Sequence, residues 1–188
     1  MKTLRKTAEE AYLKYANKII NRETWIDGFI SGIQYKKEYP QSIELCGLLW
    51  DTENLAIGGY EKDGRHYYTW QEAMDAAKSV GKRLPTWQEW EALCDLGSTW
   101  DDERKGRWFG GNHNSDHKGS LFLPAAGLRN FNSGDLAYAS SYGYFWSSSP
   151  YYGGNYNAGY LYFTSGYVYP LNYYFRAYGF SVRCVQNK

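Results

Sequence analysis

The side chains that most clearly point to a function are the phenols of a tyrosine-rich segment at positions 147–180, SSSPYYGGNYNAGYLYFTSGYVYPLNYYFRAYGF. Of the 20 tyrosines in the chain, 13 lie between Tyr138 and Tyr178, and no acidic residue follows Asp135. Tyrosine is rigid, buries a large area and keeps a hydroxyl for hydrogen bonding, and a mixture of Tyr, Ser, Gly and Asn is typical of antibody paratopes. This composition favours non-covalent recognition.

Alternation within GYLYFTSGYVYP predicts two strands joined by a turn at Ser165-Gly166. One face would carry the core residues Leu161, Phe163 and Val168. The other face would carry four tyrosines, namely Tyr160, Tyr162, Tyr167 and Tyr169. We expect these four rings to be exposed to solvent, because a contiguous patch of phenols marks a recognition surface. The aromatic residues of YGYFW, positions 142–146, are expected in the core.

Five residue types are missing from positions 147–185. Lys, Glu, Gln, Met and Trp account for 36 of the first 146 residues. At that frequency the 39 residues from Ser147 to Val185 would hold about ten, yet they hold none. The composition of strands and loops explains only part of this deficit.

The cysteines and a histidine-containing loop give weaker indications of a functional site. Cys46, Cys94 and Cys184 are widely spaced, which favours buried free thiols over a disulfide framework or a zinc site. The segment GGNHNSDHKG supplies Asn112, His113, Asn114, Asp116 and His117. A solvated loop is the favoured interpretation of this segment, with a structural calcium site as the alternative. No cofactor is expected, and no phosphate loop, nucleophile elbow or carboxylate pair is present.

The N-terminal region, residues 5–37, has apolar residues at helical spacing and predicts two helices. They could form a hairpin packed on the domain, or an attachment or oligomerisation segment, and the sequence leaves both open. The N-terminus has no continuous apolar core, so no secretory signal is expected. The net charge of +1 argues against nucleic acid as a partner, and no apolar run predicts membrane insertion.

Two further helices are predicted by a repeated capping sequence, TWQE, at positions 69–72 and 86–89. In each copy the threonine hydroxyl and the glutamate three residues later can satisfy each other's backbone amides. Before them, SIELCGLLWD predicts one buried strand, and LAIGGYEKDGRHYYTW predicts a hairpin around Asp63-Gly64. After Trp108 we expect short strands and no helix.

Four segments carry a resemblance to a known family: GKRLPTWQEWEAL, LPAAGLRNFNSG, YGYFWSSSP and GFSVRCV, in this order. Together they resemble the C-type lectin fold of the formylglycine-generating-enzyme subclass. More narrowly, they resemble the variable proteins of diversity-generating retroelements and the related Fibrobacter-type paralogous domain. The resemblance covers roughly residues 41–188. It implies an α+β fold, in which two helices pack on a loop-rich antiparallel sheet after an N-terminal helical segment over residues 1–40.

In that retroelement family, error-prone copying at template adenines rewrites codons near the C-terminus. Changing the two adenines of the codon AAC reaches Tyr, Ser, Gly, Asp and Phe, but cannot reach Lys, Glu, Gln, Met, Trp or a stop. The resemblance assigns scaffold roles to Leu161, Phe163, Ser165, Val168, Pro170, Arg176, Gly179 and Phe180. It assigns diversified, ligand-binding roles to Tyr151, Tyr152, Asn155, Tyr156, Asn157, Tyr160, Tyr162, Thr164, Tyr167, Tyr169, Leu171, Asn172, Tyr173, Tyr174, Phe175 and Tyr178. For Arg176, bridging to backbone carbonyls or a buried acid is favoured over ligand contact.

The leading hypothesis is a binding protein rather than an enzyme. It would be a phage virion component or a bacterial protein that recognises a protein or cell-surface ligand. The first alternative is a non-diversified lectin-like or structural surface domain that uses the same aromatic face. The second is an oxidase of the formylglycine-generating class, which depends in that family on two reactive cysteines close in sequence. This chain lacks such a pair, since Cys184 has no neighbouring cysteine.

Overall fold

Two helices begin directly after the threonines of the repeated TWQE sequence. The computed structural model describes residues 42–111 and 117–188, in which α3 spans Trp70–Ser79 and α4 spans Trp87–Asp95. The Thr69 hydroxyl accepts the Glu72 backbone amide, and the Glu72 carboxylate accepts the Thr69 amide at 2.8 Å. Thr86 and Glu89 repeat this arrangement, so both predicted capping boxes are confirmed.

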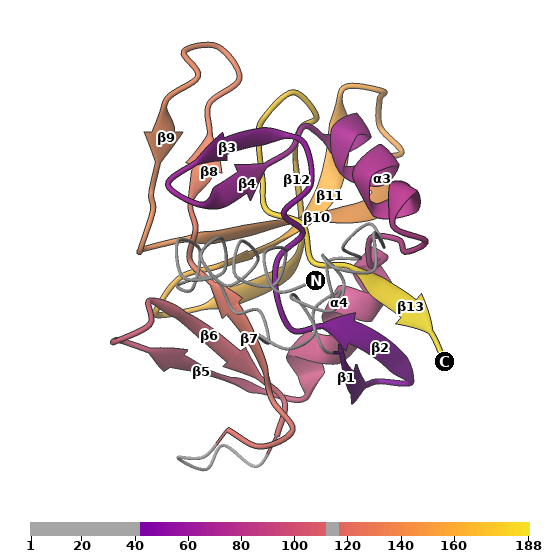
Figure 1. The fold of residues 1–188 in the computed structure, drawn as a ribbon, viewed down its shortest axis with the longest axis vertical. Coiled ribbons are helices and arrows are strands. Elements are labelled where there is room, and N and C mark those ends of the chain that lie inside the picture. The colour runs from indigo at the N-terminus through magenta and orange to yellow at the C-terminus, as the bar shows by residue number, and fades with distance from the viewer. Residues whose placement is uncertain (1–41, 112–116) are drawn as a thin grey trace, which may run out of the picture. The chain divides into compact units, whose positions relative to one another are not determined.

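The rest of the described chain is built from thirteen short strands in five small antiparallel sheets (Figure 1). The strands are β1 (Ser42–Leu45), β2 (Leu48–Asp51), β3 (Tyr60–Lys62), β4 (Arg65–Tyr67), β5 (Ser98–Asp101), β6 (Gly106–Phe109), β7 (Leu121–Pro124), β8 (Leu128–Arg129), β9 (Leu136–Ala137), β10 (Gly143–Pro150), β11 (Asn157–Phe163), β12 (Val168–Phe175) and β13 (Val185–Asn187). Their sheet orders are β1-β2-β13, β3-β4, β5-β6-β7, β8-β9 and β10-β11-β12.

The predicted fold class is therefore wrong. We expected an α+β C-type lectin fold with two helices on one loop-rich antiparallel sheet, preceded by an N-terminal helical segment. In the described residues, five separate sheets accompany two helices of ten and nine residues, so strands dominate. Strands of two to four residues offer too few alternations for a periodicity argument to detect. The segment predicted over residues 1–40 lies outside the described residues.

Of two hairpin turns, the local sequence predicted one and missed the other. The hairpin around Asp63-Gly64 is confirmed, with both residues at positive φ between β3 and β4. The single strand predicted for SIELCGLLWD is wrong, because the chain reverses at Cys46-Gly47 between β1 and β2. Both turn residues again have positive φ, of 53° and 75°. Asn-Gly and Asp-Gly are the usual signals for such a turn, so Cys-Gly did not indicate one.

In the sheet β10-β11-β12, strands β10 and β11 are largely buried while β12 is half-buried or exposed, and alternate residues of β10 and β11 belong to two different cores. Tyr144, Trp146 and Tyr160 pack with α3 and the C-terminal segment Phe180–Cys184. Phe145, Leu161 and Phe163 pack with α4 and the strands β6 and β7. Figure 1 shows this sheet between an upper group, β3, β4, β8, β9 and α3, and a lower group, β1, β2, β5–β7 and α4.

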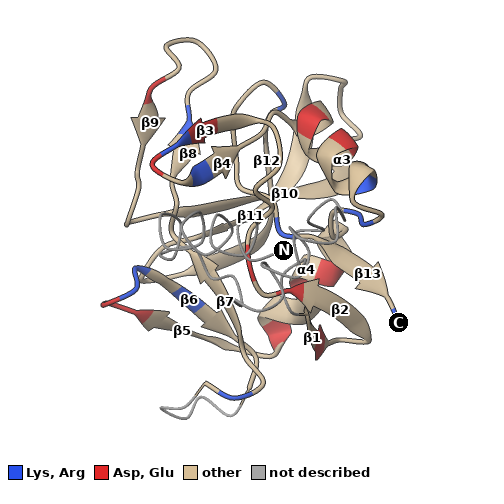
Figure 2. Ribbon diagram, in the orientation of Figure 1, with Lys and Arg blue, Asp and Glu red and all other residues tan. Residues whose placement is uncertain are grey.

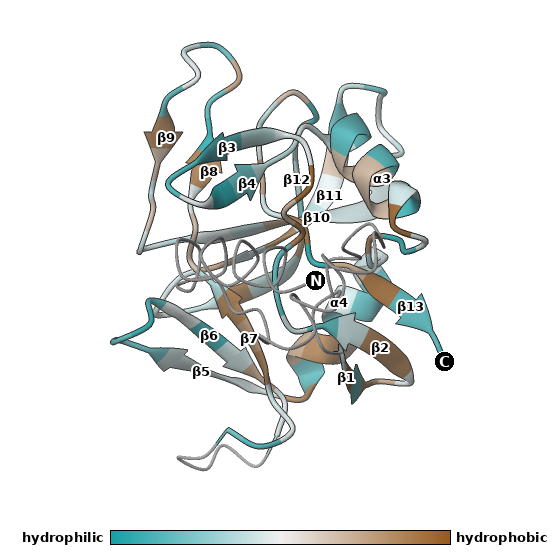
Figure 3. Cartoon of the chain, viewed as in Figure 1, coloured by the Kyte–Doolittle hydropathy of each residue, from teal (hydrophilic) through white to brown (hydrophobic). Residues whose placement is uncertain are grey.

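A bulge interrupts the pairing of β11 with β12. Tyr162 pairs with Tyr169, whereas Tyr160 pairs with Asn172, so β12 has one extra residue between these pairs. Pro170 lies in this interval, where a residue without a backbone N–H is tolerated. The β10–β12 strands are pale in the hydropathy colouring of Figure 3, because tyrosine is intermediate, while β2, β7 and β13 show strongly apolar residues. Neither helix in the described ranges has the length and hydropathy that a membrane span requires.

A bidentate ion pair links the N-terminus of α4 to the loop before it. Arg83 donates from two nitrogens to the two carboxylate oxygens of Glu89, each at 2.7 Å. Burial raises the pKa of Glu89, but hydrogen bonds from Arg83 and Thr86 outweigh it and hold this pKa below its ordinary value. The charged carboxylate therefore stabilises the fold above its ordinary pKa, and this contribution is lost as the pH falls through the lowered native value.

We expect the free energy of unfolding to fall between about pH 5 and about pH 3, and to fall less steeply in a Glu89→Gln variant. Chemical denaturation at a series of pH values measures both slopes. Identical slopes in the two proteins would show that Glu89 does not contribute to acid sensitivity.

Candidate tyrosine surface

The tip of the β11–β12 hairpin carries a cluster of three phenol rings. The Tyr162 and Tyr169 rings, from paired positions, are nearly parallel, with an interplanar angle of 4° and centroids 6.2 Å apart. The Tyr167 ring lies 5.3 Å from that of Tyr169 and 5.9 Å from that of Tyr162. Tyr169 is 52% exposed, Tyr167 is similarly exposed, and Tyr162 is half-buried between them.

A second cluster lies at the other end of β12. The Tyr174 and Tyr178 rings meet edge to face at 4.5 Å. Tyr160 lies between the two clusters, 5.9 Å from Tyr174 and 6.5 Å from Tyr162. Below, "tyrosine surface" denotes Tyr162, Tyr167, Tyr169, Tyr174 and Tyr178. These five residues form one network of ring contacts through Tyr160.

The expectation that Tyr160 is exposed with its three partners is wrong. Its side chain is only 4% exposed, and its ring lies 5.0 Å from Phe180 and 6.3 Å from Trp146. Thr164, another predicted contact residue, is buried as well. Alternation correctly placed Leu161 and Phe163 in the core, but the C-terminal segment covers part of the opposite face too. The parts of this face near the hairpin tip and at Tyr174 stay open.

The sixteen predicted contact residues divide by exposure. The exposed ones are Tyr151, Tyr152, Asn155, Tyr156, Tyr167, Tyr169, Asn172 and Tyr174; the half-buried ones are Asn157, Tyr162, Leu171, Tyr173, Phe175 and Tyr178; the buried ones are Tyr160 and Thr164. They do not share one face. Tyr173 and Tyr174 are successive residues of β12, so their side chains point to opposite faces of the sheet. The Tyr173 ring lies 4.6 Å from that of Tyr151.

Fixed side chains hold this segment mainly through its backbone carbonyls. Arg107 donates from Nε to the Thr164 carbonyl at 2.8 Å and from Nη2 to the Ser165 carbonyl at 2.9 Å. The Trp70 indole donates to the Ser147 carbonyl at 2.7 Å. These bonds do not depend on which side chains the segment carries. The scaffold can therefore keep the backbone in place while side chains change.

Arg176 has the scaffold role that was favoured for it. Its Nε donates to the Asn157 carbonyl at 2.9 Å, and its guanidinium stacks 4.2 Å from the Trp70 ring. Arg176 is the sole charge between Ser147 and Val182. Strands β10–β12 accordingly appear without charged residues in Figure 2, in contrast to α3.

We expect Arg107→Met to lower the free energy of unfolding by about 2–4 kcal/mol, because it leaves the Thr164 and Ser165 carbonyls without their donor. Ser165→Ala should change it by less than about 0.5 kcal/mol, because the Ser165 side chain is exposed and only its carbonyl is bound. Urea denaturation of both variants measures the difference. A larger loss of stability for Ser165→Ala than for Arg107→Met would contradict the anchoring of the segment through its backbone carbonyls.

Two pairs of phenols on the tyrosine surface interact through their hydroxyls, Tyr162 with Tyr167 and Tyr174 with Tyr178. Burial raises the pKa of Tyr162, and a side-chain hydrogen bond with Tyr167 raises it further. Burial and a hydrogen bond with Tyr178 likewise raise the pKa of Tyr174. Tyr162 and Tyr174 therefore stay protonated at neutral pH.

Of the three thiols expected to be buried, Cys184 is buried, Cys94 is half-buried and Cys46 is exposed. Burial raises the pKa of Cys94 and of Cys184 to about 12, so both stay protonated, and protonated thiols are poor nucleophiles. Asn112, His113, Asn114 and Asp116 lie outside the described residues. The His117 ring stacks on Trp108 at 4.2 Å. Within residues 42–111 and 117–188, no three His, Cys, Asp or Glu side chains gather as metal ligands.

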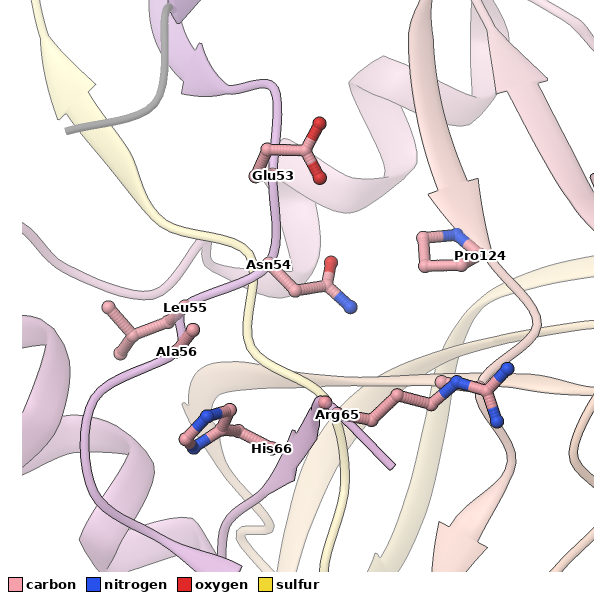
Figure 4. A pocket seen from close by; sticks show the side chains of 9 residues that line it. Glu53, Asn54, Leu55, Ala56, Arg65, His66 and Pro124 are labelled. Carbon is pink, nitrogen blue, oxygen red and sulfur yellow. The ribbon is translucent and has the colours of Figure 1, made fainter. Parts of the chain in front are cut away.

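A cavity of about 290 Å³ lies elsewhere, between the β2–β3 connection, the β3–β4 hairpin and β7 (Figure 4). Its lining consists of Glu53, Asn54, Leu55, Ala56, Gly64, Arg65, His66, Pro124 and Ala126. The side-chain oxygen Oδ1 of Asn54 accepts two hydrogen bonds from Arg183, so this side chain is part of the structural framework. None of the sixteen predicted contact residues lines this cavity.

Sequence reasoning missed three aromatic residues that adjoin the tyrosine surface. Tyr138 stacks on Tyr142 at 4.9 Å, and Tyr142 meets Tyr162 at 5.7 Å. Phe131 lies 5.0 Å from Tyr178 and 5.0 Å from Phe175. The excess of tyrosine begins at Tyr138, which was the available signal, while nothing local to Phe131 indicated that it meets the segment.

Comparison with known proteins matches part of the chain to a family model. A family model described as a domain of unknown function (DUF8237) matches residues 95–185, from the end of α4 to the start of β13. This range includes the tyrosine surface and leaves out β1–β4 and α3. No curated protein and no solved structure matches the chain.

Proposed function

We propose that this protein binds a protein or cell-surface ligand through its tyrosine-rich C-terminal surface, and that a retroelement diversifies the exposed side chains of that surface. The observation that carries the proposal is the anchoring of the segment through backbone carbonyls by Arg107, Trp70 and Arg176. A recognition surface that must accept new side chains needs a backbone whose position does not depend on them.

The composition of the segment supports diversification. Positions 147–185 lack the five amino acids that adenine replacement in AAC codons cannot produce. The chain also resembles the variable proteins of diversity-generating retroelements in the four segments quoted above. Rigid display on a hairpin lowers the ordering cost of binding, because the strands are already formed before a ligand arrives.

The surrounding DNA provides the test. We expect a nearby reverse transcriptase gene and a template repeat that differs from this coding region only at adenines. The differences should fall at exposed positions such as Tyr152, Tyr167 and Tyr169 and should spare Leu161 and Phe163. A complete genome with no such repeat would contradict the proposed diversification.

A second candidate function is a recognition surface of fixed sequence. The burial of Tyr160 and Thr164 favours it, because two positions assigned to diversification take part in packing. The same repeat distinguishes the candidates. If Tyr160 and Thr164 match the template while exposed positions differ, the surface is diversified around a fixed centre.

A further inference from the structure

Phe131 is presented by a well-ordered turn outside the tyrosine-rich segment. The Asn130 side-chain oxygen accepts the Asn132 amide at 2.8 Å, and the Asn130 backbone amide donates to the Asp135 carbonyl at 2.8 Å. This turn leaves Phe131 46% exposed. Because its ring meets those of both Phe175 and Tyr178, it extends the tyrosine surface at one end.

Tyr138 adjoins the same surface from the β9–β10 connection and has a strained backbone. Its φ is 62°, a left-handed conformation that bulky residues rarely adopt, and it is 55% exposed. Its ring reaches Tyr162 through Tyr142. A large exposed side chain held in a strained conformation indicates a functional constraint more readily than a packing role.

We propose that Phe131 and Tyr138 are constant contact residues of the binding surface, and that its partner is an uncharged, aliphatic-rich patch on a folded protein. The inference rests on the proposed function. Both residues lie before position 147, so they keep their identity while the segment between them and the C-terminus changes. They would serve as anchors common to every ligand, with specificity supplied by the tyrosine surface.

The chemistry of the surface favours a protein over a glycan. The tyrosine surface carries no Lys, Arg, Asp or Glu side chain, and the Asn172 side-chain oxygen already accepts the Tyr173 amide. Exposed aromatic rings with little charge are typical of the centre of protein–protein interfaces, where they pack against aliphatic side chains.

The test uses a phage-displayed library of a small folded domain with randomised surface residues, selected against the immobilised full chain. Enriched clones are then measured against four variants: Phe131→Ala, Tyr138→Gly, Tyr169→Ala and Leu96→Ala. Leu96 is the control, an exposed apolar residue at the end of α4. We expect Phe131→Ala and Tyr138→Gly to weaken most clones about tenfold, and Leu96→Ala to change little.

Tyr138→Gly separates contact from folding, because glycine adopts a φ of 62° without strain. Its thermal midpoint should equal or exceed that of the wild type while binding weakens about tenfold. If Tyr169→Ala abolishes binding but Phe131→Ala and Tyr138→Gly do not, the constant contacts are refuted and the proposed function stands. If none of the three matters, the clones bind elsewhere and both proposals fail. Binding to a glycan panel with no enriched protein clone would overturn the partner class.

Discussion

Replacing Asp51 with alanine is expected to lower the free energy of unfolding by about 3–5 kcal/mol, because the buried Lys82 ammonium loses the carboxylate that it contacts and Arg183 loses part of the negative charge near it. Lys82 Nζ lies 2.5 Å from the Asp51 carboxylate, and both side chains are nearly inaccessible. Arg183, also buried, donates to the Asp51 backbone carbonyl at 2.9 Å. Burial lowers the pKa of Arg183 to about 10, so it remains charged at neutral pH and needs nearby negative charge.

Denaturant unfolding of Asp51→Ala beside Glu44→Ala measures this effect. Glu44 forms an exposed ion pair with Lys188 at 3.0 Å, and such pairs contribute about 0–1 kcal/mol. Similar losses in the two variants would show that burial does not strengthen the Asp51 interactions. Asp51 ends β2, and Arg183 precedes β13, so the loss should uncouple the C-terminal strand from its sheet first.

The second large effect concerns Tyr160, which was predicted to contact ligand and instead lies in the core. Tyr160→Ala is expected to lower the free energy of unfolding by about 3–5 kcal/mol, because it opens a cavity against Phe180, Tyr144 and Trp146. Tyr152→Ala should change it by less than about 0.5 kcal/mol, since that side chain is 88% exposed.

Thermal and urea unfolding of the two variants provide the comparison, with Tyr160→Phe as a third that keeps the ring. A Tyr160→Ala protein as stable as Tyr152→Ala would contradict the burial described above. The result also bears on diversification. A position that costs several kcal/mol when truncated cannot vary freely, so changes at 160 should be limited to large aromatic residues.

Local signals predicted the helices well. The reciprocal bonds of Thr69 with Glu72 and of Thr86 with Glu89 depend on four consecutive residues, and the sequence contains all of them. The Asp63-Gly64 turn was equally local. The Cys46-Gly47 turn was not predicted, because cysteine seldom adopts positive φ and nothing nearby indicated that the chain reverses there.

The candidate site could be predicted only in part, because burial depends on distant segments. Alternation separates Leu161 from Tyr162, but it cannot show that Phe180, twenty residues further on, covers Tyr160. Phe131 shows the same limit from the other direction, since its contact with Phe175 spans more than forty residues. Alternation predicted the exposed tyrosines at the hairpin tip correctly, because no later segment covers them.

The absence of charge on the tyrosine surface has a kinetic consequence. Without oppositely charged patches, encounters are not steered, and association of such surfaces proceeds at about 10⁵–10⁶ M⁻¹ s⁻¹. Arg176 keeps its positive charge, but it lies against Trp70 and is not one of the tyrosine-surface residues. Sequence variants of the surface that remain uncharged should thus share one association rate and differ in residence time. Selection among them would act on how long each complex lasts, and salt would change their binding very little.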